Sequence, residues 1–258
     1  MDSTKKKIIE ALKDQQDIFG DDLFDESVIE NKTVKPSQHP KEYNLPEKKV
    51  TVVKEPVKNP AQLFDKAKSD WEDAESLEQL NNMICNCTKC DLHKGRTNFV
   101  FGSGNPNAKV MVIGEGPGAE EDKQGLPFVG RAGQLLTDIL KAIKFSREEV
   151  YIGNIVKCRP PNNRAPLPDE MDACIPYLNK QIELIKPKLI LCLGLTAAKG
   201  LLRKKESLTA LRGQIFDYNG IKVMVTFHPA ALLRNPNWKK DCWADVQKFR
   251  KLYDETIN

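Results

Sequence analysis

Residues 109–118, KVMVIGEGPG, decide the fold, because a short apolar run passes there directly into a glycine-rich loop. An apolar run of this length, rich in valine and isoleucine, is typical of a buried β-strand, and the glycines after it permit a tight turn. Similar runs at 150–153, 188–193 and 221–227 each lead into a polar residue or a glycine. The sequence therefore predicts four strands, the first of them at 109–113.

Helical segments are predicted between and after these strands, at 132–144, 168–186, 195–203 and 239–255. Pro168 and the two acids that follow it suit a helix start, because proline fits the first turn and acids fit the positive end of the helix dipole. Strands that alternate with helices need crossover connections, which give a parallel sheet covered on both faces. We therefore expect an α/β fold.

Unusual residues stand where the predicted strands end. The first strand leads into GEGPG (114–118) and then acids at 120–122, and the other three lead into Asn154, Gly194 and His228. In such sheets, ligands bind outside the carboxyl ends of the strands. We therefore expect a carboxylate cluster, an amide and an imidazole to converge on one rim and form a site.

Each of these residues also has a purely structural interpretation. The GEGPG loop could be only a tight turn, Asn154 a turn residue and Phe128 part of the core. The loop is not a dinucleotide-binding fingerprint, because its glycine spacing differs and no helix is predicted to open directly from it. His228 is the stronger candidate, since the chain has only three histidines and the other two lie elsewhere.

Four of the seven cysteines are candidates for one metal site. Cys87 and Cys90 are separated by two residues, and Cys158 and Cys174 flank a later loop rich in Pro, Asn and Arg. Two close pairs of thiolates can complete one tetrahedral site, and the spacing permits either zinc or a four-iron cluster. Cys85 is an alternative to Cys87 in the first pair.

Charge divides the chain into two parts. Residues 1–80 carry thirteen Lys, no Arg and eighteen Asp or Glu, a net charge of −5, whereas the remainder carries 27 basic and 18 acidic residues, a net charge of +9. A domain this basic suits nucleic acid, although a solvated basic face would carry the same charge. We expect a flexible, acidic then Lys/Pro-rich extension at 1–60 and a globular domain at 61–258, with helices at 2–19 and 61–84.

A membrane location is not expected. No apolar run approaches the ~20 residues that span a bilayer, and the first residues lack the apolar core of a signal peptide. We expect a cytoplasmic protein, nucleoid-associated if prokaryotic, in which thiols stay free for metal binding.

Three stretches of the chain resemble the family 4 uracil-DNA glycosylases, the iron–sulfur branch of that superfamily. They are CTKCDLHKGRTNFVFGSGNPNAKVMVIGEGPGAEEDKQGLPFVGRAGQLL (87–136), VYIGNIVKCRPPNNRAPLPDE (150–170) and FHPAALLRNP (227–236). The resemblance implies a three-layer α/β/α fold with a short, mainly parallel central sheet. It implies an enzyme that flips uracil out of single- or double-stranded DNA, hydrolyses its N-glycosidic bond and leaves an abasic site. We expect it to act as a monomer.

The resemblance also implies a cofactor and its ligands. The expected group is a [4Fe-4S] cluster, with zinc as the less favoured occupant. Its ligands would be Cys87, Cys90, Cys158 and Cys174.

The resemblance further implies a uracil pocket. One wall would be formed by Glu115, Gly116 and Pro117. Phe128 would stack on the base, Asn154 would read its pairing edge, and His228 would approach the ring oxygen beside the glycosidic nitrogen.

The chemistry of these residue types fits that implication. An Asn amide offers one donor and one acceptor, which match O4 and N3–H of uracil but not the amino group of cytosine. Bond cleavage produces a uracil anion, and a hydrogen bond from His228 would strengthen as that charge develops. Glu115 or Glu121 could orient water and offset charge on the sugar, and the sequence does not separate them.

DNA contacts are expected from the loops around the pocket. Leu232 or Leu233 could enter the vacated stack as an apolar wedge, or belong to the core. Candidate phosphate contacts, which could equally be surface cations, are Arg234, Arg164, Arg159 and Lys157.

Three other hypotheses remain. A branch that traps uracil-DNA covalently carries an extra basic loop ending in histidine, which is missing after Asn154 here. A DNA-binding protein that uses the cysteine site only as structure would not need His228 or Asn154 for its behaviour toward uracil. An iron–sulfur electron carrier would leave both residues and the +9 charge without a purpose.

Overall fold

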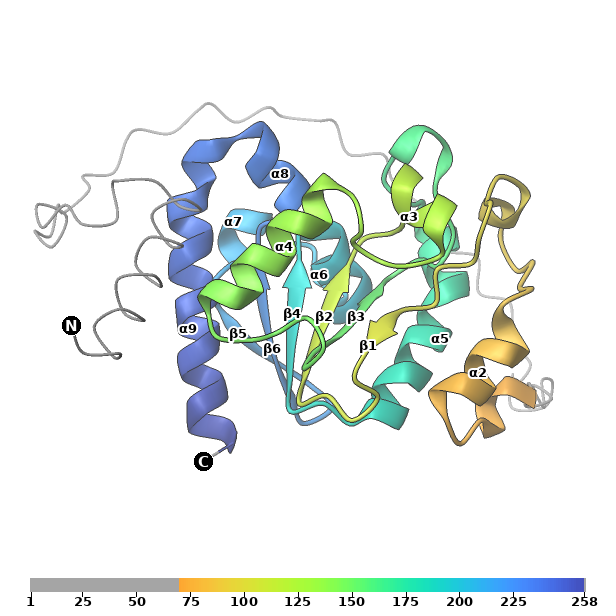
Figure 1. The fold of residues 1–258 in the computed structure, drawn as a ribbon, viewed down its shortest axis with the longest axis horizontal. Helices are drawn as coiled ribbons and strands as arrows, with labels where there is room; N and C mark the ends of the chain where they lie inside the picture. The colour runs from red at the N-terminus through yellow and green to blue at the C-terminus, as the bar shows by residue number, and fades with distance from the viewer. Residues whose placement is uncertain (1–69, 258) are drawn as a thin grey trace, which may run out of the picture. The chain divides into compact units, whose positions relative to one another are not determined.

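The computed structural model of the chain describes residues 70–257, so the predicted extension at 1–60 and the helix at 2–19 lie outside the described residues. The described strands form one six-stranded sheet in the order β1-β3-β2-β4-β6-β5 (Figure 1). They are β1 (Ser103–Gly104), β2 (Val110–Gly114), β3 (Tyr151–Asn154), β4 (Leu189–Leu193), β5 (Ile215–Tyr218) and β6 (Ile221–Thr226). The four predicted strands are confirmed as β2, β3, β4 and β6.

These four strands run parallel and form the centre of the sheet. Gly114 pairs with Asn154 across β2 and β3, and Leu193 pairs with Thr226 across β4 and β6, so the strands end close to one line. The edge strands β1 and β5 are antiparallel and were not predicted. The sheet is mixed but mostly parallel, as the sequence indicates.

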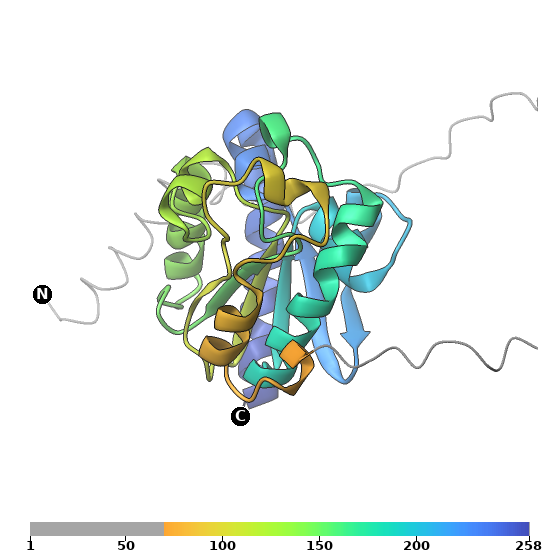
Figure 2. The same cartoon turned by 90° about the vertical axis from the view of Figure 1, so that its right-hand side faces the viewer.

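Helices cover both faces of the sheet. They are α2 (Leu77–Ile84), α3 (Ala119–Gln124), α4 (Arg131–Ala142), α5 (Pro168–Ile185), α6 (Leu195–Leu202), α7 (Leu208–Leu211), α8 (Pro229–Arg234) and α9 (Lys239–Ile257). Short 3-10 turns lie at Asp70–Asp73, Asp91–Lys94, Pro161–Asn163 and Pro236–Trp238. Seen from the β1 edge, the sheet stands between α4 on one side and α5 on the other (Figure 2).

The core consists of two apolar layers, one on each face of the sheet. Along β2, Met111 and Ile113 face a cluster that includes side chains of α2, α5 and α6. Val110 and Val112 face the other cluster, with side chains of α4 and α9. Successive residues of a strand point to opposite faces, so a strand buried on both sides reads as the continuous apolar run seen in the sequence.

Two details of the prediction are wrong. A helix does open directly from the GEGPG loop, since α3 begins at Ala119 with Gly118 as its N-cap. The helix expected at 61–84 is not continuous over its described part, because Asp70–Asp73 is a separate 3-10 turn and α2 starts at Leu77, where the Ser76 side chain caps it. A serine cap that accepts from the backbone at the third following residue starts a new helix.

Within residues 70–257, no helix is long and apolar enough to cross a membrane.

Candidate functional site

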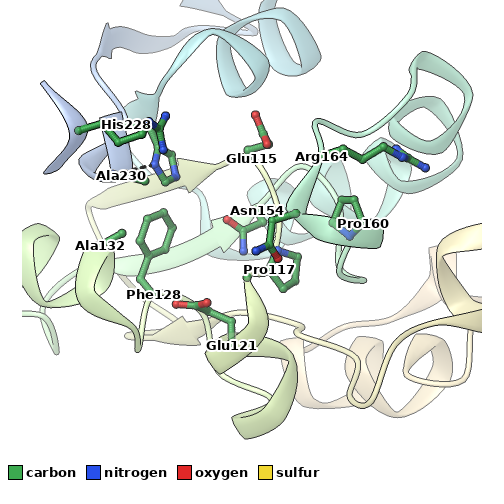
Figure 3. Close-up of a pocket in the computed structure, with 14 residues that line it drawn as sticks. Glu115, Pro117, Glu121, Phe128, Ala132, Asn154, Pro160, Arg164, His228 and Ala230 are labelled. Carbon is green, nitrogen blue, oxygen red and sulfur yellow. Dashed lines mark hydrogen bonds between the residues drawn. The ribbon is translucent and has the colours of Figure 1, made fainter. Parts of the chain in front are cut away.

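A pocket of about 380 Å³ opens at the carboxyl ends of the parallel strands (Figure 3). Its lining residues are Glu115, Gly116, Pro117, Gly118, Glu121, Phe128, Ala132, Asn154, Pro160, Asn163, Arg164, His228, Ala230 and Arg234. Glu115, Glu121, Asn154 and His228 therefore do converge, whereas the other two predicted acids, Glu120 and Asp122, do not line the pocket. The volume lies within the range of small-ligand sites, about 300–1,000 Å³.

Asn154, at the end of β3, has an unusual amide. The residue is 2% exposed, yet its Oδ1 is buried without a hydrogen-bond partner among the described residues. A buried polar atom left unpaired costs about 1–3 kcal/mol, so such atoms are rare outside functional sites. The amide faces the pocket beside Phe128 (Figure 3). This atom is therefore available to a ligand.

Phe128 lies across the pocket from the loop after β2, with a ring 5.5 Å from that of His228 between centroids. Its backbone φ is 53°, which is unusual for a bulky residue and indicates a strained backbone at this position. Close approach is permitted by Gly114, where an added Cβ would lie 2.6 Å from Phe128 Cζ and 2.5 Å from Asn154 Oδ1. A glycine at this strand end thus lets the ring and the amide meet.

Glu121, on α3, holds the strained loop in place. Its Oε1 accepts hydrogen bonds from the backbone N–H groups of Val129 (2.9 Å) and Gly130 (3.0 Å), directly after Phe128. Arg147 donates to the carbonyl of Pro127, directly before Phe128 in the chain. These contacts bracket Phe128 and offset the backbone strain, so Glu121 is engaged in positioning the aromatic ring.

Glu115 differs from Glu121 in its surroundings. It follows β2 directly and lines the pocket in a half-buried position. Among the described residues, none donates a hydrogen bond to its carboxylate. The structure therefore separates the two acids that the sequence left equivalent.

His228 follows β6 and is the N-cap of α8. Its Nδ1 accepts a hydrogen bond from the Ala230 backbone N–H at 3.2 Å, which leaves Nε2 to carry the ring proton (Figure 3). Burial, assisted by the positive charge of Arg234, lowers the pKa of His228 to about 4. The ring is thus a neutral donor, and Gly194, whose added Cβ would lie 3.1 Å from His228 Cβ, leaves room for it.

The predicted DNA-contacting residues are in different situations. Leu232 is 1% exposed and belongs to the core, whereas Leu233 is 40% exposed on α8. Of these two leucines, only Leu233 is exposed enough to enter a base stack as a wedge. Arg234 lines the pocket rim. Lys157 is fully buried, so its interpretation as a phosphate contact is wrong.

Arg164 is held by a bidentate ion pair. Its Nη1 and Nη2 donate to the two carboxylate oxygens of Glu170 at 2.8 and 2.7 Å, and Glu170 also accepts from the Leu167 N–H. Glu170 is 3% exposed, which makes this pair stronger than an ordinary surface salt bridge. Arg164 thus braces the loop between β3 and α5.

The four predicted metal ligands share one neighbourhood. Cys158 and Cys174 are buried, and Cys87 and Cys90 pack against the same core cluster. Burial raises the pKa of the Cys158 thiol, and the charges of Cys90 and Cys87 raise it further. In the same way, burial raises the pKa of Cys174 to about 12, with contributions from Cys158 and Cys90.

Hydrogen bonds to sulfur surround this group of thiols. Arg96 Nη1 donates to Cys158 Sγ (3.2 Å) and Tyr177 Oη donates to Cys87 Sγ (3.3 Å). The thiol of Cys85 instead donates to the Asn82 carbonyl. Because a cation and a hydroxyl are directed at the sulfurs, the donor set fits thiolates held by a metal group. Over the described part of the chain, no three His, Cys, Asp or Glu side chains lie in a geometry that could hold one metal ion.

Several lining residues escaped the sequence prediction. They are Gly118, Ala132, Pro160, Asn163 and Ala230. Pro160 and Asn163 belong to the Pro/Asn/Arg-rich loop between Cys158 and Cys174, where the sequence analysis singled out Arg164 as a DNA contact but did not name these two residues.

Comparison with known proteins finds a matching family model and several similar proteins. The model of the uracil DNA glycosylase superfamily matches residues 101–247. A type-4 uracil-DNA glycosylase of Thermotoga maritima is 52% identical over 163 residues, which cover 62% of this chain and 85% of that protein. Type-4 enzymes of Sulfurisphaera tokodaii and Archaeoglobus fulgidus are 46% and 42% identical, covering 69% of this chain in both cases and 85% and 94% of those proteins.

Proposed function

Because the chain belongs to the uracil DNA glycosylase superfamily and matches type-4 members over most of their length, we propose that it excises uracil from DNA. The reaction is hydrolysis of the N-glycosidic bond, which releases free uracil and leaves an abasic site. The base must first leave the duplex, and a pocket of about 380 Å³ can receive it.

The observation that carries this proposal is the unpaired Oδ1 of Asn154 beside the face of Phe128. An acceptor at this position suits N3–H of uracil, and the amide nitrogen suits O4. Cytosine has no N3 proton and carries an amino group in place of O4, so it would leave the amide mismatched. Stacking on Phe128 contributes about 1–3 kcal/mol toward the cost of flipping the base.

His228 would stabilise the leaving group. In its neutral form, with Nδ1 occupied by the Ala230 N–H, the ring can donate from Nε2 to the uracil oxygen where negative charge develops. A neutral donor does not protonate the base, so it acts by hydrogen bonding in the transition state. Loss of one donor of this kind typically lowers kcat by about 10²–10³.

Glu115 is the carboxylate that we assign to the attacking water and to the positive charge on the sugar. It lines the pocket and has no competing donor, whereas Glu121 is engaged by the Val129 and Gly130 N–H groups. We assign Glu121 the positioning of Phe128. Under this proposal the two acids, which the sequence could not separate, have different roles.

A [4Fe-4S] cluster is the proposed occupant of the four-cysteine site, with zinc as the alternative. When bound, it would fasten segments that are far apart in sequence, since its ligands would be Cys87, Cys90, Cys158 and Cys174. Arg96 and Tyr177, which donate to two of the sulfurs, would offset the negative charge of the thiolates. Its proposed contribution is structural support for the loop that borders the pocket.

Leu233 is the proposed wedge for the gap in the base stack, and Arg234 the proposed phosphate contact. We propose that the enzyme acts as a monomer. Its substrate is uracil in single- or double-stranded DNA, and we place its action in the cytoplasm.

The test is incubation of the purified protein with a single-uracil oligonucleotide, followed by alkali to cleave abasic sites. The proposal requires cleavage by the wild type and a loss of about 100-fold or more in Asn154→Ala, because the base would lose its polar partner. DNA binding without cleavage, at full metal content, would favour the non-catalytic DNA-binding alternative.

A further inference from the structure

Lys157 is fully buried, and none of the steps above uses it. It stands three residues after Asn154 and one before Cys158. Lysine is rarely buried completely, because its amine must then be hydrogen-bonded inside the protein. Lys157 thus lies between the pocket and the cysteines, and the partners of its amine indicate its role.

The amine of Lys157 makes two internal hydrogen bonds. Nζ donates to the backbone carbonyl of Asn154 at 3.1 Å and to Gln181 Oε1 at 2.6 Å. Gln181, on α5, is itself fully buried and donates to the Phe101 carbonyl (3.0 Å) and to Tyr151 Oη (3.1 Å). The amine therefore links the end of β3 to a network that is anchored on α5.

The backbone of Lys157 is fixed as well. Its carbonyl accepts from the Val100 N–H at 2.8 Å. Both ends of the residue are thus tied to the body of the domain, which makes it a rigid support.

Asn154, in contrast, has no hydrogen bond that holds its amide oxygen. Its Oδ1 has no partner among the described residues, so the direction of the amide depends on packing and on the backbone from which it projects. That backbone is held on one side by the strand pairing, in which Gly114 accepts from the Ile155 N–H. The Asn154 carbonyl is held by Lys157.

We propose that Lys157 is a positioning residue for base recognition: its hydrogen bond to the Asn154 carbonyl fixes the strand end from which the amide reads uracil. This inference rests on the proposed function. A displaced amide loses alignment with the base, and a misplacement of about 1 Å can cost on the order of 10²-fold in rate.

The test compares Lys157→Met, which keeps the length and removes the donor, with Lys251→Met, whose side chain is 81% exposed on α9. Lys157→Met should lower kcat/KM for a uracil oligonucleotide by about 10–100-fold. Its affinity for abasic-site DNA, which presents no base to Asn154, should stay within about twofold of the wild type. Lys251→Met should change neither quantity.

A merely structural role would give a different result. It would weaken abasic-site binding or metal content in parallel with activity, and either outcome overturns the proposal, as does wild-type kcat/KM in Lys157→Met. If Lys157→Met does not fold, Lys157→Met/Gln181→Met removes the amine together with its acceptor on Gln181, so that Gln181 Oε1 is not left buried without a donor. Excision by this double variant at the wild-type rate would also overturn it. Absence of excision by the wild type would instead refute the proposed function.

Discussion

Gly114→Ala tests the geometry of the pocket, because this glycine is where the amide and the aromatic ring approach the backbone. An added Cβ would lie 2.5 Å from Asn154 Oδ1 and 2.6–2.7 Å from two ring carbons of Phe128, where ordinary contacts begin at 3.4 Å. Both groups would have to retreat by roughly 0.7–0.9 Å, since the packed interior leaves little room. Gly114 has no positive φ, so alanine adds contact strain and not backbone strain.

A displacement of this size predicts that kcat/KM for uracil excision falls by about 100-fold. The assay is single-turnover cleavage of a uracil oligonucleotide after alkali, with the melting temperature and metal content measured on the same preparation. Gly95→Ala is the matched control, because an added Cβ there meets nothing within 4 Å, and its activity should be unchanged. A folded, metal-replete Gly114→Ala with wild-type kcat/KM would refute the proposed roles of Asn154 and Phe128.

Three further predictions follow from the site. Burial holds the pKa of His228 near 4, below its usual 6.5, so the ring stays neutral and excision should show no loss from this group until the pH approaches 4. The unfolded chain takes up the His228 proton from about pH 6.5 downward, so the stability of the folded protein should fall between pH 6.5 and 4. A pH–rate profile with a transition near 6.5 that disappears in His228→Gln would contradict this prediction. Glu121→Ala should lower kcat by about 10-fold or more, because Phe128 would lose the contacts that hold its loop. Glu121→Gln keeps one acceptor oxygen and should retain more activity. Equal losses of kcat in the two variants would count against the positioning role. Cys158→Ser should lower the iron content and the melting temperature together, whereas Cys85→Ser should change neither. If metal analysis finds undiminished iron in Cys158→Ser, Cys158 is not a ligand.

The sequence predicted the central fold well, because strands buried on both faces read as continuous apolar runs. Strands β2, β3, β4 and β6 and helices α4, α5, α6 and α9 all lie where the pattern placed them. The short edge strands were missed since β1 has only two residues and β5 is partly exposed throughout, so neither gives an apolar run. The short helices α3, α7 and α8 span six residues or fewer, too few for a helical period to emerge.

Convergence of the site was predictable for the same reason, since parallel strands bring their carboxyl ends to one edge. What sequence could not reveal was which contacts each side chain makes. Glu115 and Glu121 look alike in the sequence, and only the backbone partners of Glu121 separate them. Leu232 and Leu233 are neighbours on a short helix, where one residue of rotation decides between core and surface.

Lys157 shows this limit most clearly. A lysine two residues before an arginine, next to a Pro/Asn-rich loop, indicates a surface cation, and its burial depends on Gln181, which is 24 positions away in the sequence. Phe128 is similar, because nothing in its neighbours predicts a φ of 53°. Both features arise from tertiary contacts.

The most direct test of the account measures the bases released from two otherwise identical oligonucleotides that carry uracil or cytosine at one position. We predict free uracil from the first, no free cytosine from the second because it lacks the N3 proton that Asn154 Oδ1 would accept, and loss of uracil release in Asn154→Ala. Release of cytosine at a rate comparable to uracil, or undiminished uracil release by Asn154→Ala, would contradict the central claim that this amide reads the base.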